Sequence, residues 1–558
     1  MMTGMARTSG KRLFLELLKQ EGVKVLFGNP GTTELPLMDA LAGEDDIRYV
    51  LGLQEAVVMA MADGYARASR GIAACNVHVA PGLGNAMGML FDAQKAGSPI
   101  LVTAGQQAQG FGITEPNLYA ELPEMAAHLV KYAVEARSVR DLPVLLHRAV
   151  KTALAPPTGP VFVSLPVDVM NAEAEVAVGA PSRVRALGVA DADEVARAGA
   201  LLAAARRPVI IAGDAVDQSM SAAELVAFAE ALGAPVYIEG ENSTLPFPPT
   251  HPLFRGPIVR LGGAIRKILA QHDLLFSAGA DLFTLSLPPE VAPVPDGMVI
   301  VHLDTDAWQL GKNFPTACAL LGDPKTTLPA LVAAMAPGLD TATRDARRAA
   351  TEAAITADFA ALDARATAEA DWTPVSALAL MQAIGKHLPP EAVVVDETIS
   401  SGAGLFQFLK RAPAGSVFGM RGGGIGWGLP AAVGVQLALP ERRVVALVGD
   451  GSAMYSIQAL WTAAHEKVPV VFVIINNRSY RILKQRAAAS RGSAAQTGRY
   501  VGMELSEPAI SFTGLAASMG VPAVSVSTIA KFVEALKLGL ASDHPLLIEV
   551  AADDSFRG

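Results

Sequence analysis

Three successive α/β domains are predicted by the pattern of the chain. Short apolar runs bounded by Gly or Pro alternate with helical stretches through the first 185 residues, again through the middle third, and again from Trp372 onward. Apolar runs of this length between helices are typical of parallel strands that are covered on both faces. We therefore expect each domain to be a mostly parallel sheet flanked by helices, and 558 residues suffice for about three such domains.

The elements follow in order. The first domain (1–185) has predicted strands at 23–27, 48–53, 72–79, 99–104 and 160–166, and a helix at 56–69. The central domain (186–335) has predicted strands at 208–213, 234–239, 273–279 and 298–304, and a helix at 222–232. A linker rich in Ala and charged residues (336–371) lacks strand signals and is predicted to be helical. The last domain (372–558) has clear strand signals at 392–395, 444–448, 468–475 and 546–550.

Composition excludes several classes of protein. The chain is 51% hydrophobic and 18% charged, which is incompatible with a disordered chain, and its net charge of −9 gives no basic footprint for nucleic acid. Two cysteines cannot build a disulfide framework or a zinc site. The first residues lack the apolar core of a secretion signal, and the longest uncharged stretches carry Asn, His and Pro, so no membrane span is expected. The expected location is the cytoplasm.

One motif indicates chemistry. The apolar run 444–448 leads directly into Gly449-Asp450-Gly451-Ser452, and a second apolar run, 468–475, ends at Asn476-Asn477. With one helix predicted at about 456–466, the segment reads as a βαβ unit, whose right-handed crossover brings both strand ends to one edge of the sheet. A carboxylate and an amide oxygen that converge there suit Mg²⁺, and the glycines allow the backbone to approach a diphosphate. An unrelated turn and Asn pair is the structural alternative.

This motif resembles the signature of enzymes that depend on thiamine diphosphate (ThDP), and the resemblance extends along nearly the whole chain. Within that superfamily the chain is most similar to benzoylformate decarboxylases, and it shares its three-domain plan with acetolactate synthase-like large subunits. The segments that carry the likeness to the decarboxylases are GNPGTTELP at 28–36, LQEA at 53–56, ADGYA at 62–66, NVH at 76–78, GNAMG at 84–88 and TAGQQ at 103–107.

The resemblance implies a pyrimidine-binding domain first, a central domain, and a diphosphate-binding domain last. It implies ThDP and Mg²⁺ as cofactors, and active sites between subunits, so that a homodimer is the minimum and a homotetramer is expected. The implied metal ligands are Asp450, Asn477 and the backbone carbonyl of Ser479. The implied cofactor contacts are Glu55, Ser400, Gly423, Ile425, Gly449, Asp450, Gly451, Ser452, Tyr455, Asn477 and Tyr480.

Three residues are implied to be catalytic. Glu55 would bond the aminopyrimidine nitrogen and so promote loss of the thiazolium C2 proton, which gives an ylid; a first-turn glutamate favoured by the helix dipole is the structural alternative. His78, at the end of a strand, would lie near the substrate carboxylate and relay protons. Thr32 stands where the decarboxylases have a serine, so its hydroxyl would bond that carboxylate in a narrower pocket; a turn or cap residue is the alternative.

One departure from the decarboxylase pattern affects the predicted reaction. The segment 283–287 (FTLSL) lacks the second active-site histidine, and His302, the nearest one, lies in an apolar strand and reads as structural. The predicted function is non-oxidative decarboxylation of a 2-oxo acid through an ylid and an enamine. Without that histidine the enamine would be protonated slowly, which favours an alternative function, that of an acetolactate synthase-like carboligase. An alternative from another class is a non-catalytic ThDP-binding protein.

No feature of the central domain requires FAD, which is not expected. The basic segment 478–499 is either a lid or, as the preferred interpretation, a solvated loop. Within it, the short basic run from Lys484 to Arg491 is predicted to be a solvated face.

Overall fold

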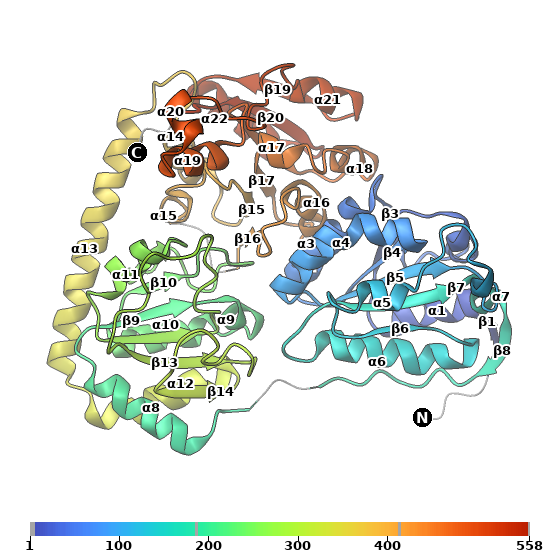
Figure 1. Cartoon of the computed structure of the whole chain (residues 1–558), viewed down its shortest axis with the longest axis horizontal. Coiled ribbons are helices and arrows are strands. Elements are labelled where there is room, and N and C mark those ends of the chain that lie inside the picture. Colours follow the sequence, from blue (N-terminus) through green and yellow to red (C-terminus); the bar gives the residue numbers. More distant parts are fainter. Residues whose placement is uncertain (1–5, 185–187, 411–414, 556–558) are drawn as a thin grey trace. The chain divides into compact units, whose positions relative to one another are not determined.

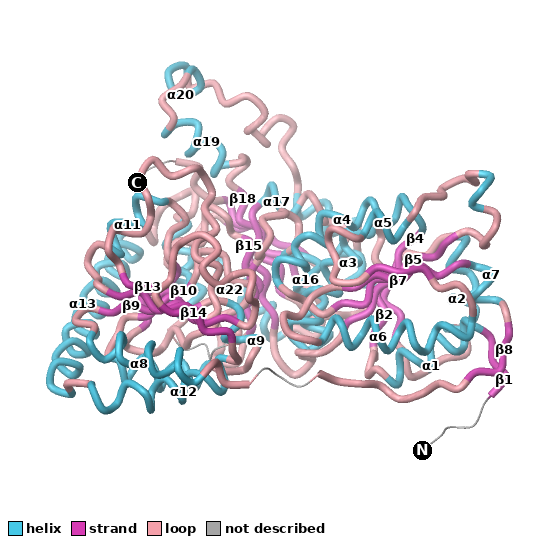
Figure 2. Tube along the Cα trace, turned by 60° about the horizontal axis from the view of Figure 1, so that its bottom comes forward, coloured by secondary structure: helices cyan, strands magenta, loops and turns pink. Residues whose placement is uncertain are grey.

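The computed structural model describes residues 6–184, 188–410 and 415–555. The chain divides into two compact units (Figure 1). The first unit contains the described residues up to 184, then 393–401 and 420–555, and the second contains 188–392, 402–410 and 415–419. Three large sheets of parallel strands flanked by helices are visible in magenta and cyan in Figure 2, which confirms the predicted α/β class.

The amino-terminal sheet lies in the first unit. Its strands, in spatial order, are β3 (Arg48–Leu51), β2 (Val25–Gly28), β4 (Ala73–His78), β5 (Ile100–Gln106), β7 (Val161–Pro166) and β6 (Ala133–Glu135). Its helices are α1 (Gly10–Gln20), α2 (Leu35–Leu41), α3 (Glu55–Ser69), α4 (Val79–Ala96), α5 (Leu122–Ala126), α6 (Leu142–Leu154) and α7 (Val167–Asn171). The central strands β2, β5 and β7 are buried along their whole length, which explains their continuous apolar sequences.

The carboxyl-terminal sheet belongs to the same unit. Five of its strands, in spatial order, are β15 (Val393–Glu397), β17 (Val444–Gly449), β18 (Val471–Asn476), β20 (Leu546–Ala551) and β19 (Ala523–Val526). Its helices are α16 (Gly428–Ala438), α17 (Asp450–Ala453), α18 (Ala459–His465), α19 (Arg481–Ala489), α20 (Ser493–Thr497), α21 (Phe512–Ser518) and α22 (Ile529–Ala541). Numbered along the chain, these strands have the spatial order 1-2-3-5-4, and β2, β4, β5, β7 and β6 have the same order, so the two sheets share a topology.

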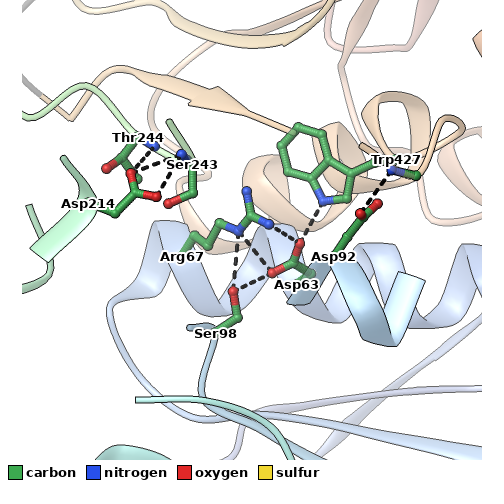
Figure 3. Close-up of polar contacts among 9 residues, drawn as sticks. Asp63, Arg67, Asp92, Ser98, Asp214, Ser243, Thr244 and Trp427 are labelled. Carbon is green, nitrogen blue, oxygen red and sulfur yellow. Dashed lines mark hydrogen bonds and ion pairs between the residues drawn. The ribbon is translucent and has the colours of Figure 1, made fainter. Parts of the chain in front are cut away.

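Helices α3 and α16 join these two halves of the first unit at close range. A Cβ atom on Gly64 would lie 2.3 Å from the carbonyl oxygen of Ala431, and one on Gly434 would lie 2.0 Å from that of Met61, so only glycine permits this approach. Beside the contact, the buried carboxylate of Asp63 pairs with Arg67 and accepts a hydrogen bond of 2.6 Å from the indole Nε1 of Trp427 (Figure 3). This contact fixes the start of α16 against the amino-terminal half.

The second unit contains the central sheet. Its strands, in spatial order, are β11 (Phe254–Pro257), β10 (Val236–Ile238), β9 (Pro208–Ala212), β12 (Leu274–Ala278), β13 (Val299–Asp304) and β14 (Cys318–Leu321). Its helices are α8 (Ala192–Ala204), α9 (Asp214–Gln218), α10 (Ala222–Leu232), α11 (Gly262–Leu269), α12 (Pro324–Met335), α13 (Thr341–Ala368), α14 (Ala377–His387) and α15 (Leu405–Phe408). Asp214 accepts hydrogen bonds from the backbone N–H groups of Ser243 and Thr244 and so closes the loop after β10 (Figure 3).

The strands that were not predicted are peripheral. Strands β6, β11, β14 and β19 are edge strands with partly exposed residues, and β1 (Ala6–Ser9) pairs with β8 (Glu173–Val176) in a separate antiparallel ribbon. Because these strands are only partly buried, some of their positions carry polar residues. They therefore lack the continuous apolar run that identifies the central strands. The linker forms the long helix α13, yellow in Figure 1. None of the described helices combines the length and the apolar character that a membrane span requires.

Candidate functional site

Asp450 and Asn477 lie at one edge of the carboxyl-terminal sheet. Strands β17 and β18 are parallel neighbours, and Gly449 at the end of the first is in register with Ile475 near the end of the second. Asp450 follows the first strand and Asn477 follows the second, so both side chains stand beyond the same carboxyl edge. The connection contains two short helices, α17 and α18, where the sequence predicted one, because the chain turns at 454–458 before α18 begins.

The carboxylate of Asp450 is buried and incompletely satisfied. Burial raises its pKa to about 6, and the backbone N–H groups of Gly451, Arg478 and Ser479 oppose that rise. Its Oδ2 atom has no hydrogen-bond partner in the described chain. The loop after β18 is held by its own contacts, since Asn477 Oδ1 accepts from the backbone N–H of Ser479 at 3.1 Å. A buried, unpartnered carboxylate oxygen beside an amide oxygen fits a divalent cation with oxygen ligands.

No group of three or more His, Cys, Asp or Glu side chains with metal-binding geometry occurs among the described residues. A metal in this chain would therefore be bound by a mixed set of donors. Asp450, Asn477 and a backbone carbonyl of Ser479 form such a set of hard oxygen donors, which Mg²⁺ prefers.

Two glycines form close contacts with tyrosines next to this edge. A Cβ atom on Gly451 would lie 2.6 Å from the ring of Tyr480, and one on Gly426 would lie 2.5 Å from Cβ of Tyr455. Burial raises the pKa of Tyr480, and the neighbouring Tyr455 adds to the rise. Ser452 is buried next to Gly451. The surroundings of Asp450 thus place hydroxyl groups and close backbone where phosphate oxygens can be bound.

The loop 422–428 carries two further predicted cofactor contacts. Gly423 is exposed with φ of +85°, and a Cβ there would meet no atom within 4 Å, so its backbone faces open space. Ile425 is half-buried in the same loop. Ser400 is half-buried just after β15, and it follows Ile399, a β-branched residue with φ of +28°. Such a conformation is strained for isoleucine and is held only where the surrounding structure demands it.

Glu55 begins helix α3 at the carboxyl edge of the amino-terminal sheet. Gln54 caps the helix through its side-chain oxygen, and Glu55 is buried. Its Oε2 accepts a hydrogen bond of 3.0 Å from Asn85. Its Oε1 accepts none from the described residues and lies beside Gly82, whose Cβ would be only 3.2 Å away. One oxygen of a buried carboxylate is thus held in place while the other is available to a ligand.

His78 ends β4 and is held by a carboxylate that the sequence analysis did not select. Its Nδ1 donates to Glu34 Oε2 at 2.6 Å, which leaves Nε2 as the outer nitrogen. Glu34 is itself anchored, since it accepts from the backbone N–H groups of Gly31 at 3.0 Å and Gly105 at 2.7 Å. The signal for Glu34 was its position three residues after Gly31 in the loop GNPGTTE, where a glutamate side chain reaches back to the loop backbone.

The neighbouring threonines differ in position. Thr32 is exposed, whereas Thr33 is buried and its hydroxyl oxygen lies 3.2 Å from His78 Nδ1. Val79, directly after His78, has φ of +40°, another strained β-branched residue at a strand end. Gly82 packs against both His78 and Glu55, so the structure brings these two residues together, and Thr32 stands on the loop that contacts His78.

Two other predictions concern residues outside this group. His302 is buried in β13, where its Nε2 donates to the carbonyl of Ala280 at 2.9 Å, and burial lowers its pKa to about 4. This confirms its structural interpretation. The basic run beginning at Lys484 was interpreted as a solvated face, which is wrong for Lys484 itself: it is buried and forms ion pairs with Glu504 and Asp554. Helices α19 and α20 occupy most of the segment 478–499.

Comparisons with known proteins agree with this geometry. Three family profiles match in order: the thiamine pyrophosphate enzyme N-terminal TPP binding domain at residues 8–111, the central domain at 195–331, and the C-terminal TPP binding domain at 401–550. Benzoylformate decarboxylase of Pseudomonas aeruginosa is 34% identical over 541 residues, which are 96% of this chain and 97% of the relative. A putative acetolactate synthase large subunit of Mycobacterium tuberculosis is 30% identical over 97% of this chain and 98% of its own.

A solved structure shows the same fold. The thiamine diphosphate-dependent 4-hydroxybenzoylformate decarboxylase of Rhodococcus jostii superposes with a TM-score of 0.86 at 32% identity, covering 98% of this chain and 99% of that one. Sequence profiles, a full-length relative above 30% identity and this structure lead to one conclusion. The chain belongs to the thiamine pyrophosphate enzyme family, whose members similar to it are 2-oxo acid decarboxylases and acetolactate synthases.

Proposed function

We propose that the protein catalyses non-oxidative decarboxylation of a 2-oxo acid, with ThDP and Mg²⁺ as cofactors. The observation that carries the proposal is the state of Glu55, a buried carboxylate with one oxygen held by Asn85 and the other available. A carboxyl group in this position can bond a ring nitrogen of the aminopyrimidine. The bound cofactor would supply the nucleophile and the electron sink that decarboxylation needs.

Asp450, Asn477 and the Ser479 carbonyl would hold Mg²⁺ and, with it, the diphosphate. The unpartnered Oδ2 of Asp450 supports this assignment, because a buried carboxylate oxygen without a partner is unfavourable unless a ligand completes it. Replacing Asp450 by Asn should weaken ThDP binding at saturating Mg²⁺ at least tenfold, as measured by calorimetry. Equal affinity of D450N and wild type would contradict the metal assignment.

The contacts with the substrate carboxylate are proposed for His78 and Thr32. Glu34 binds Nδ1 of His78, so Nε2 is the ring nitrogen that would exchange a proton with the substrate or product. The hydroxyl of Thr32 would bind the substrate carboxylate. The contacts Ser400, Gly423, Ile425, Gly449, Gly451, Ser452, Tyr455 and Tyr480 would complete the cofactor site.

We propose domains at 1–185 (pyrimidine-binding), 186–335 (central) and 372–558 (diphosphate-binding), with a helical linker at 336–371. We propose a homodimer or homotetramer in which one subunit supplies Glu55 and His78 and another supplies Asp450 and Asn477. We place the enzyme in the cytoplasm, and mass measurement of the purified protein tests its assembly.

A carboligase is the second candidate. It is favoured by the segment Phe283–Leu287, which carries no histidine, and by His302, which is buried and committed to Ala280. Without a second proton donor, the decarboxylated fragment would persist long enough to be captured by another carbonyl compound. Product analysis by NMR separates the two reactions: the protein, loaded with ThDP and Mg²⁺, is supplied with aliphatic and aromatic 2-oxo acids, benzoylformate first. Aldehyde as the main product supports the decarboxylase, and a hydroxyketone or acetolactate-type product supports the carboligase.

Glu55→Gln tests catalysis against mere binding. A catalyst should lose exchange of the thiazolium C2 proton of ThDP at least a hundredfold while it retains most of its affinity, because the amide cannot protonate the ring nitrogen. Asn85→Ala removes the hydrogen bond to Oε2 but keeps the Glu55 carboxylate, so it should retain more of the C2 exchange than E55Q. If wild type exchanges C2 no faster than E55Q, the protein binds ThDP without activating it.

A further inference from the structure

The loop 422–428 contains five glycines in seven residues, so its own sequence gives it little rigidity. It nevertheless has to present Gly423 and Ile425 in one conformation if these residues contact the cofactor as proposed. Something outside the loop must hold it. Two buried carboxylates from other elements do so, one on α4 and one at the end of β15.

Asp92 on α4 binds the first half of the loop. Its Oδ1 accepts from the backbone N–H of Gly424 at 3.0 Å (Figure 3). A Cβ on Gly422 would lie 2.1 Å from the same oxygen, so the carboxylate packs directly on the loop backbone. Asp92 thereby fixes the amino-terminal side of Gly423 and Ile425.

Glu397, the last residue of β15, binds the second half. It is 1% exposed. Its Oε1 accepts from the backbone N–H of Gly426 at 2.6 Å, and its Oε2 accepts from that of Gly428 at 2.5 Å. On the neighbouring strand β17, Glu397 is in register with Val448, two residues before Asp450. One buried carboxylate therefore binds the glycine loop from the strand beside the one that leads into Asp450.

We propose that Glu397 is a positioning residue that holds the glycine loop 422–428 at the carboxyl end of β15, beside the strand that leads into Asp450, and so sets the conformation in which ThDP is bound. The inference rests on the proposed function. Glu397 itself would touch neither cofactor nor substrate. It would act through Gly426 and Gly428, by keeping Gly423 and Ile425 at a constant distance from the site of the diphosphate.

The two oxygens of Glu397 explain why a carboxylate is needed. Each faces a different N–H donor, so both must act as acceptors, and an amide would place its NH₂ against one of the donors. Burial raises the pKa of Glu397 to about 7, and the two loop amides oppose the rise by favouring the ionised form. Replacement by Gln should therefore release one end of the loop.

The neighbouring Asp396 provides a matched control. Its Oδ1 accepts two hydrogen bonds, from the backbone N–H of Thr398 at 3.1 Å and from the hydroxyl of the same residue at 2.7 Å. Asparagine retains that oxygen, so D396N makes the same acid-to-amide change one residue away without losing an acceptor. E397D is a second test variant, which keeps the charge but withdraws it from the loop by one methylene.

Two measurements are made on each protein. Hydrogen–deuterium exchange of the peptide covering 420–430 is followed by mass spectrometry without cofactor. Exchange of the C2 proton of ThDP is then followed by NMR at saturating ThDP and Mg²⁺. E397Q is expected to speed amide exchange and to slow C2 exchange, each at least tenfold, and D396N is expected to stay within twofold of wild type in both.

The outcomes are separable. If E397Q matches D396N in either measurement, the inference is overturned, because the loop is then either not held by Glu397 or not limiting for cofactor geometry. Where E397Q fails to fold by circular dichroism, E397D decides by the same two criteria. A wild-type protein that binds no ThDP overturns the proposed function, whereas equal C2 exchange in wild type and E397Q overturns only the role of Glu397.

Discussion

Replacing Asp63 by Asn should be among the most destabilising single changes of charge in the first unit. Asp63 is 0% exposed. Its carboxylate accepts from Nε of Arg67 at 2.9 Å, from a second guanidinium nitrogen, from the hydroxyl of Ser98 and from the indole of Trp427 at 2.6 Å (Figure 3). Asparagine removes the charge and one acceptor oxygen, while every donor stays in place.

The magnitude follows from burial. The side chain of Arg67 is 4% exposed, so in the variant its charge remains buried without the carboxylate that compensates it. Removing one partner of a buried ion pair costs about 3–5 kcal/mol. The guanidinium also lies over the Trp427 ring, 4.7 Å from its centroid, and this contact cannot replace a full counter-charge. We expect a loss of about 3–5 kcal/mol in the free energy of unfolding of the first unit.

The control lies in the same unit. Glu173 pairs with Arg7 at 3.0 Å, but the two side chains are 56% and 74% exposed. E173Q should therefore change stability by less than about 1 kcal/mol. Urea unfolding at 25 °C without cofactor, followed by far-UV circular dichroism, gives both values from the shift in midpoint. If D63N lies within about 1 kcal/mol of E173Q, the argument from burial is refuted.

Two further predictions concern stability. Burial lowers the pKa of His302 to about 4, against 6.5 for an exposed histidine. Its contribution to the free energy of unfolding is therefore complete above pH 6.5 and is lost as the pH falls toward 4. H302Q keeps an N–H donor for the Ala280 carbonyl but has no titrating group. The free energy of unfolding should therefore fall by up to about 3 kcal/mol less in H302Q than in wild type between pH 7 and pH 4. An equal fall in both proteins would contradict the prediction. G434A should lower the free energy of unfolding by about 1–3 kcal/mol, because the added Cβ would meet the Met61 carbonyl oxygen. G88A in α4 should raise it by about 0.5–1 kcal/mol, because a Cβ there meets nothing within 4 Å. Similar thermal shifts for the two glycine variants would show that the α3–α16 contact is not as close as described.

The sequence predicted best those elements whose residue pattern follows from a single physical requirement. Buried parallel strands require continuous apolar residues, so the central strands of all three sheets were recognisable within a few residues. The edge strands were not, because partial exposure permits polar residues. The convergence of Asp450 and Asn477 could also be predicted, since the handedness of a βαβ unit places consecutive strand ends at one edge.

Contacts between distant segments could not be predicted in this way. Glu34 pairs with His78 across 44 residues, and Asp92 reaches Gly424 across 332. Nothing in the local sequence of Asp92 distinguishes it from a solvated carboxylate, and Lys484 shows that a basic side chain predicted to be solvated can also be buried. Only packing decides which charged group is buried, because burial depends on neighbours that are remote in the chain.

The sequence by itself therefore determined the α/β class, the order of the main strands, and the residue types at the two strand edges where a cofactor can bind. Those features depend on local periodicity and on chain handedness, which short segments already contain. The tertiary structure alone decided which carboxylates hold those residues in place. Glu397 is the clearest case, because its role exists only when a glycine loop some thirty residues later folds back onto the end of its strand.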